Sequence, residues 1–119
     1  DFKRFVKKDI GTGEGASGST VYTVPSSSST AMESIVIGIT IANKSTAGIT
    51  CDVFLDAKEG AGSDVYIVKD ASIPAGSSLE VMSGNKLVLQ GDGTDNDIIK
   101  MTSSTASAAD GIVSVLEDV

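Results

Sequence analysis

The densest group of potential metal ligands lies in a glycine-rich segment that reads Gly91-Asp-Gly-Thr-Asp-Asn-Asp97. Its carboxylates, Asp92, Asp95 and Asp97, offer the oxygen atoms of which Ca²⁺ takes about six to eight. The spacing departs from the EF-hand pattern, and calcium-binding β-roll repeats come in several copies, whereas this segment occurs once. Asp, Asn and Gly are also the ordinary residues of tight turns. We therefore expect an acidic turn and no metal, with a calcium site as the weaker alternative.

A second motif, Gly13-Glu-Gly-Ala-Ser-Gly18, matches the spacing G-x-G-x-x-G. In a dinucleotide site this motif follows a strand and opens a helix, whose N-terminus meets the pyrophosphate. Here the β-type segment Thr20–Val24 follows instead, and the carboxylate of Glu14 would repel a phosphate. The motif is therefore interpreted as a flexible Gly/Ser linker.

Nucleophilic catalysis has little support in the residue types available. The chain contains no His, so the usual general base at neutral pH is missing for the serine run Ser26–Ser29. The single Cys51 falls on the inward face of an expected strand, where a thiol behaves as a small inert hydrophobe. One Cys also excludes an intramolecular disulfide and a structural zinc site. We expect no enzymatic activity and no cofactor.

Charge is unevenly divided between the N-terminal segment and the rest of the chain. Residues 1–8 carry four bases and one acid, whereas residues 9–119 carry five bases and fifteen acids, within a net charge of -7. The candidate partner-binding residues of the basic segment are Phe2, Lys3, Arg4, Phe5, Lys7 and Lys8. This segment suits docking on an acidic neighbour, but also a solvated terminus or an edge strand guarded by Lys. The acidic remainder argues against nucleic-acid binding, and no apolar run reaches the about 20 residues that span a bilayer.

The elements that must position these residues are strands. Glu33–Asn43 places Ile35, Ile37, Ile39 and Ile41 at period two, which predicts a central strand with one apolar face. We expect further short strands at residues 20–24, 49–56, 64–72, 78–82, 86–90, 97–102 and 111–117.

About eight short strands separated by turn residues predict an all-β fold, an antiparallel β-sandwich of jelly-roll or Ig-like type. The segment 43–48 is expected to close a hairpin between the strands that flank it. We divide the chain into a basic N-terminal arm with a Gly-rich linker, residues 1–18, and a sandwich domain, residues 19–119. Residues 2–10 either form a ninth strand or remain an extended arm.

Phe54 is a possible interface residue. The alternation in Ile49–Asp56 puts its ring outward between Asp52 and Asp56, and aromatic residues are enriched in interface cores. The alternative is that a bulge reverses the strand's faces or that a loop covers the ring.

Several segments carry a family resemblance in combination, and they extend from Phe2 to Glu117. In chain order they read FKRFVKKDIGT, VYTVP, IVIGITIAN, ITCDVFL, VYIVKDASIPAGSSLEVM, KLVLQ, IIKMTSS and GIVSVLE. Their order resembles that of small virion structural proteins of tailed bacteriophages, particularly of cyanophages. The most distinctive segments are VYTVP, IVIGI-x-IAN and VKDA-x-IPAGSSL.

The resemblance implies a non-enzymatic sandwich module located in the virion, assembled in the host cytoplasm, with no catalytic residues. The first hypothesis is a capsid decoration or cement protein, a homo-oligomer with a trimer favoured, anchored on the major capsid protein by its N-terminal arm. The alternative is a neck, tail or fibre-attachment component that binds neck or tail subunits. A carbohydrate- or cell-surface-binding sandwich is less favoured, because the chain has no Trp and only two Tyr to stack on sugar rings.

Overall fold

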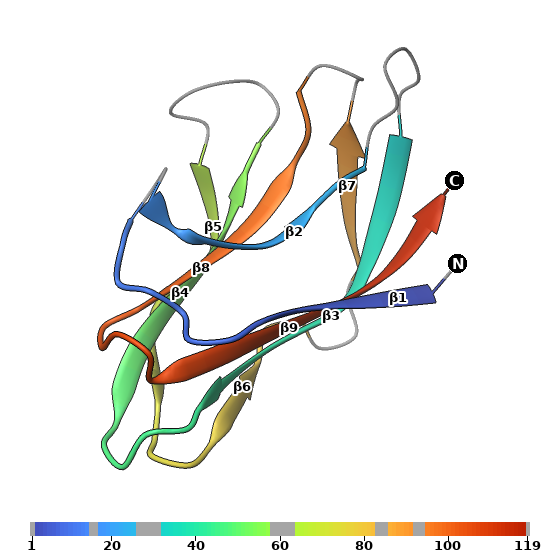
Figure 1. Cartoon of the computed structure of the whole chain (residues 1–119). Helices are drawn as coiled ribbons and strands as arrows, with labels where there is room; N and C mark the ends of the chain where they lie inside the picture. The colour runs from blue at the N-terminus through green and yellow to red at the C-terminus, as the bar shows by residue number, and fades with distance from the viewer. Residues whose placement is uncertain are drawn as a thin grey trace.

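A computed structural model describes residues 2–14, 17–25, 32–57, 64–82, 86–91 and 95–118. Within these ranges the chain forms nine strands (Figure 1). They are β1 (Phe2–Lys7), β2 (Ser19–Thr23), β3 (Met32–Asn43), β4 (Ile49–Asp56), β5 (Asp64–Ile73), β6 (Ser78–Glu80), β7 (Leu87–Gly91), β8 (Ile98–Ser103) and β9 (Ala109–Asp118).

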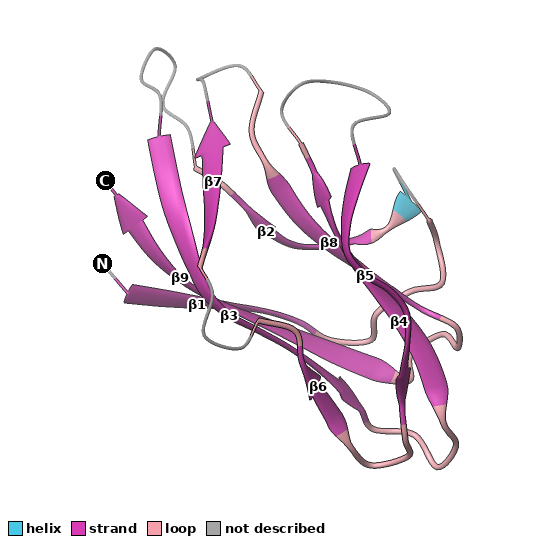
Figure 2. Ribbon diagram, turned by 180° about the vertical axis from the view of Figure 1, so that it is seen from behind, coloured by secondary structure: helices cyan, strands magenta, loops and turns pink. Residues whose placement is uncertain are grey.

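The strands form two antiparallel sheets, so the predicted all-β antiparallel class is confirmed. The five-stranded sheet has the order β1-β9-β3, and both β6 and β7 pair with the other side of β3. The four-stranded sheet has the order β2-β8-β4-β5. Figure 2 shows the two groups of strands from behind. As predicted, β3 is a central strand.

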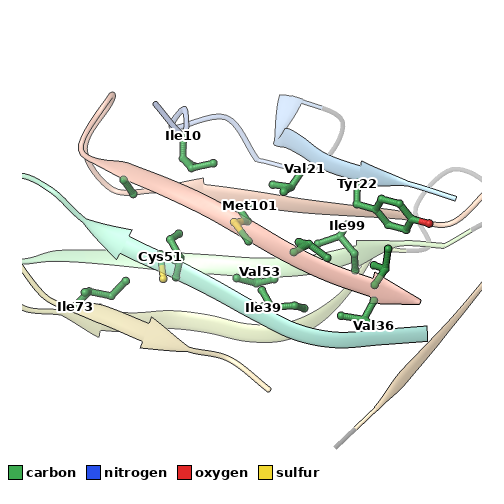
Figure 3. Packing of buried hydrophobic residues seen from close by; sticks show 14 of the residues in the cluster. Ile10, Val21, Tyr22, Val36, Ile39, Cys51, Val53, Ile73, Ile99 and Met101 are labelled. Atoms are coloured by element: carbon green, nitrogen blue, oxygen red, sulfur yellow. The ribbon is translucent and has the colours of Figure 1, made fainter. Parts of the chain in front are cut away.

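Buried side chains from both sheets form one apolar cluster (Figure 3). Val36 and Ile39 of β3 and Val53, Ile99 and Met101 of the other sheet are all fully buried. At about 1.5–3 kcal/mol for each large aliphatic side chain removed from water, this cluster is the main source of stability. The core therefore fixes the inner face of each sheet and, by alternation, the outer face.

The alternation along β3 differs from the prediction that four isoleucines share one face. Ile39 and Ile41 are fully buried, but Ile37 is 40% exposed. The register of β3 against β9 shifts between Val36 and Gly38, which makes Ile37 an extra residue in a β-bulge. Because side chains in a strand alternate with period two, one extra residue reverses the faces. Ile35 and Ile37 consequently lie on the outer side of the sheet.

The hairpin predicted for residues 43–48 is wrong, because β3 and β4 belong to different sheets. Asn43 is 2% exposed, and its side-chain amide donates hydrogen bonds to the carbonyl oxygens of Ala47 (2.8 Å) and Ile73 (3.0 Å). Its side-chain oxygen accepts a bond from the backbone N–H of Ser45 (2.9 Å). These bonds satisfy the polar groups of a turn that carries the chain from one sheet to the other.

Candidate interaction surface

The outer side of the five-stranded sheet gathers most of the exposed large apolar side chains. Of the seven such residues among those described, five lie there: Phe2, Val6, Ile37, Val88 and Ile112. Their exposed fractions range from 40% for Ile37 to 77% for Phe2. Half-buried Ile35 and Leu116 lie between them. We call these seven residues the apolar face.

Strand register arranges the apolar face in rows. Phe2 pairs with Leu116, Leu116 with Ile35, and Ile35 with Val88, so one apolar row crosses β1, β9, β3 and β7. At about 4.8 Å between strands the row is about 14 Å long. Ile35, Val88 and Leu116 also line a shallow hollow of about 400 Å³, bordered by Glu33. Exposed apolar patches are a common feature of surfaces through which proteins contact partners.

Val6 and Ile112 form a second apolar pair, four residues along β1 from the first row. Thr40 of β3 continues this row beside Ile112. Val6 is 58% exposed and Ile112 is 43% exposed. The apolar face therefore extends along the sheet as well as across it.

The basic N-terminal residues form an edge strand in place of the expected extended arm. All six residues of β1 pair with β9, from Phe2 opposite Leu116 to Lys7 opposite Gly111. Of the two alternatives left open by the sequence, the ninth strand is the one observed. Lys and Arg on an edge strand hinder pairing with further strands, so the charge of this segment has a structural explanation.

Alternation divides the candidate residues of β1 between the two sides of the sheet. Lys3 and Phe5 point inward: the Lys3 Nζ lies 2.9 Å from a carboxylate oxygen of Glu117, and the Phe5 ring centre lies 4.6 Å from that of Tyr22. Phe2, Arg4 and Val6 lie on the opposite side, where each is exposed. Lys7 and Lys8 are exposed at the end of the strand.

A buried polar network holds β1 in place. The Tyr22 hydroxyl lies 2.7 Å from the Ser34 hydroxyl and donates a 2.7 Å hydrogen bond to Glu117, which is 4% exposed. Burial raises the pKa of Glu117, but the hydrogen bonds and charge of Lys3 and the bond from Tyr22 outweigh it and lower the pKa overall. Burial also raises the pKa of Tyr22, which stays a neutral donor. The network joins β1, β9, β2 and β3.

The residues just before the glycine motif are tied to the four-stranded sheet. The Gly11 carbonyl accepts a 3.0 Å hydrogen bond from the backbone N–H of Ser103. A β carbon at Gly13 would lie 2.5 Å from the Ser17 carbonyl oxygen, so a tight turn explains this glycine without a nucleotide. Residues 15 and 16 of the motif lie outside the described residues.

Glu14 lies within that turn, where its carbonyl oxygen accepts a 2.9 Å hydrogen bond from the backbone N–H of Ser17, and its carboxylate lies near that of Asp52. It accepts a 3.3 Å hydrogen bond from the Tyr66 hydroxyl. Burial, together with the hydrogen bond and negative charge of Asp52, raises the pKa of Glu14. A carboxylate in this position adds negative charge where a phosphate would have to lie.

Phe54 is fully buried, so of the two alternatives left open by the sequence the exposed interface residue is wrong and a buried ring is observed. Its ring packs against Tyr66, with ring centres 5.4 Å apart, and lies outside the cluster between the sheets. Lys100, its register partner in β8, is itself 7% exposed and its Nζ lies 3.2 Å from Asp56. A neighbouring strand covers the ring, an arrangement that period-two alternation within β4 alone cannot reveal.

The acidic turn has a structural role in its described part. Asp97 is 6% exposed, and its carboxylate accepts a 2.8 Å hydrogen bond from the backbone N–H of Gln90. Its own N–H donates to the Gln90 carbonyl at 2.9 Å. Asp95 is described, but Asp92 lies outside the described residues. Across the described ranges, no three His, Cys, Asp or Glu side chains come together in a group that could hold a metal ion.

Cys51 lies in the core cluster at 2% exposure, on the inward face that the sequence predicted. Burial and the negative charge of Asp52 raise its thiol pKa to about 11. A thiol in this state is a poor nucleophile at neutral pH.

In the part of the chain that the structure describes, no helix has the length and apolar character needed to cross a membrane. No protein-family model matches the sequence, and a search of curated proteins finds no match for it.

Proposed function

We propose that this protein is a non-enzymatic structural component of a tailed-bacteriophage virion, a decoration or cement protein on the outside of the head shell. The observation that carries the proposal is the apolar face, which suits a protein that works through contacts with other subunits. The sequence resemblance supplies the virion setting. In this proposal the two sheets belong to a β-sandwich of jelly-roll or Ig-like type.

The edge strand β1 supports the same function with a second kind of contact. Arg4, Lys7 and Lys8 are exposed along it, in a chain whose remaining residues are strongly acidic. Such a basic edge suits an acidic strip on the major capsid protein. Many copies repeated by the symmetry of a shell turn weak single contacts into firm attachment.

The test measures the protein composition of virions purified from infected cells that express this protein. Quantitative mass spectrometry is expected to find the protein at hundreds of copies per particle, the number of a shell protein. A dozen copies or fewer would replace the decoration role by a neck or tail role. Absence from particles that contain the other structural proteins would contradict the proposal.

A further inference from the structure

We propose that the apolar face is the interface of a two-fold symmetric dimer, in which a second copy of this chain packs its own apolar face against it. This inference rests on the proposed assembly function and names the first partner of that surface. Exposed Lys7, which alternation places on the other side of β1 from Arg4, then remains for contacts with the particle.

The outer side of the five-stranded sheet approaches the size of a stable dimer interface. Its strands contain six (β1), ten (β9), twelve (β3), three (β6) and five (β7) residues, and each residue covers about 16 Å² at about 3.4 Å along a strand and about 4.8 Å between strands. The whole outer side therefore projects to about 590 Å² before side-chain relief is added, against the about 800 Å² that each partner buries in a standard interface.

A two-fold axis parallel to the strands packs the first apolar row on itself, and in the second row it sets Ile112 opposite Thr40 and Val6 opposite Glu80. This rotation places β1 of one copy over the β6 and β7 side of the other. Phe2 then faces Val88 of the second copy, and Leu116 faces its Ile35, so the row that crosses four strands packs on itself in reverse. An isologous interface requires this kind of self-complementary surface.

The same rotation brings opposite charges together at the borders of the face. Exposed Glu80 of β6 is in register with Val6, so the rotation sets it two residues along the strand from exposed Arg4 and near the end of β1 that carries exposed Lys8. Exposed Glu33 comes to lie beyond Phe2, four residues from Arg4. Lys86, before β7, is the one exposed base among the described residues of that far border. An axis perpendicular to the strands would place β1 over β1 and bring the like charges together. Charge therefore selects the first orientation.

Sedimentation velocity of Val88→Ser against Val65→Ser tests the dimer. The two valines are matched in exposure, at 52% and 56%, but Val65 lies in β5 of the other sheet. For the wild-type chain and for Val65→Ser at micromolar concentration, we expect sedimentation to give a molecular mass twice that of one chain. Val88→Ser removes apolar burial twice in a two-fold interface and is expected to raise the dissociation constant about tenfold or more.

Circular dichroism melts of both variants check that the fold is retained, as surface substitutions predict. A wild-type chain that stays monomeric, a trimer, or equal weakening by both substitutions would overturn the dimer. A monomer that is nevertheless found in purified particles contradicts this inference and leaves the proposed function standing. A protein that dimerises through this face but is absent from particles supports this inference and contradicts the proposed function.

Discussion

Deletion of residues 1–10 is expected to unfold the domain rather than only to detach it from a partner. The deletion removes β1, all of whose six residues pair with β9, and also Ile10, which is fully buried. It leaves Glu117 without the ammonium group that lies 2.9 Å away in the intact chain. Loss of one large aliphatic core residue costs about 2–5 kcal/mol, against a total stability of about 5–15 kcal/mol for a domain.

Circular dichroism and a proton–nitrogen NMR spectrum of the truncated chain measure this effect. The control is the double variant Phe2→Ser and Arg4→Ser, which alters only side chains on the outer side of the sheet and is expected to stay folded. A truncated chain with a cooperative melt near the wild-type temperature would show that residues 1–10 are a dispensable arm.

Glu117→Ala is expected to lower the free energy of unfolding by about 3 kcal/mol. Glu117 is 4% exposed and receives hydrogen bonds from Tyr22 and Lys3, so among the described residues its loss leaves the buried Tyr22 hydroxyl with Ser34 as its hydrogen-bond partner. Breaking a buried charged pair by removal of one partner costs about 3–5 kcal/mol when the remaining charge is buried. The expected loss of about 3 kcal/mol lies at the low end of this range because the Lys3 side chain is 45% exposed and can reach water.

Urea unfolding of Glu117→Ala measures the loss, with Glu80→Ala as the matched control. Glu80 is exposed in the same sheet, and its substitution is expected to change stability by less than about 0.5 kcal/mol. Equal stabilities of the two variants would contradict the role of the buried network.

The contribution of Glu117 also has a defined pH dependence. Its pKa in the folded state lies below the ordinary value of 4.5, so the folded state favours the ionised carboxylate. The resulting stabilisation is therefore present above the unfolded-state pKa and is lost as the pH falls through the folded-state pKa. We expect the stability difference between the wild type and Glu117→Gln to shrink between neutral pH and about pH 3, as seen in urea unfolding. A difference that grows on acidification would reverse this assignment.

The sequence predicted strand positions well because alternation is a local property. Ile49–Asp56 was predicted at the observed bounds of β4, and β3 differs by one residue at its start. Pairing between distant strands is not local, which is why the connection at 43–48 joins two sheets rather than two strands of one hairpin.

The apolar face was missed for a related reason. The even spacing of the isoleucines in β3 predicts a single inward face, but the bulge at Ile37 sends Ile35 and Ile37 outward. A bulge depends on the register against β9, which residue spacing within β3 does not encode. An excess of apolar positions on both sides of one strand was the available signal, since Val36 faces inward between the two isoleucines.

The side of the sheet on which each candidate residue of the basic segment lies also depends on long-range pairing. Alternation along Phe2–Lys7 separates outward Arg4 from inward Lys3 only once β9 is known as the partner strand. Phe54 is buried by Tyr66, which lies on another strand. In both cases the residue type was informative, but the contact that decides its role comes from elsewhere in the chain.

Hydroxyl-radical footprinting of the protein in its assembled and monomeric states tests most directly whether the apolar face is the assembly surface. We predict that oxidation of Phe2, Ile37, Val88 and Ile112 falls severalfold on assembly, while oxidation of Val65, 56% exposed on the other sheet, stays unchanged. Continued oxidation of the four apolar-face residues in the assembled state, with protection at Val65 instead, would contradict the account.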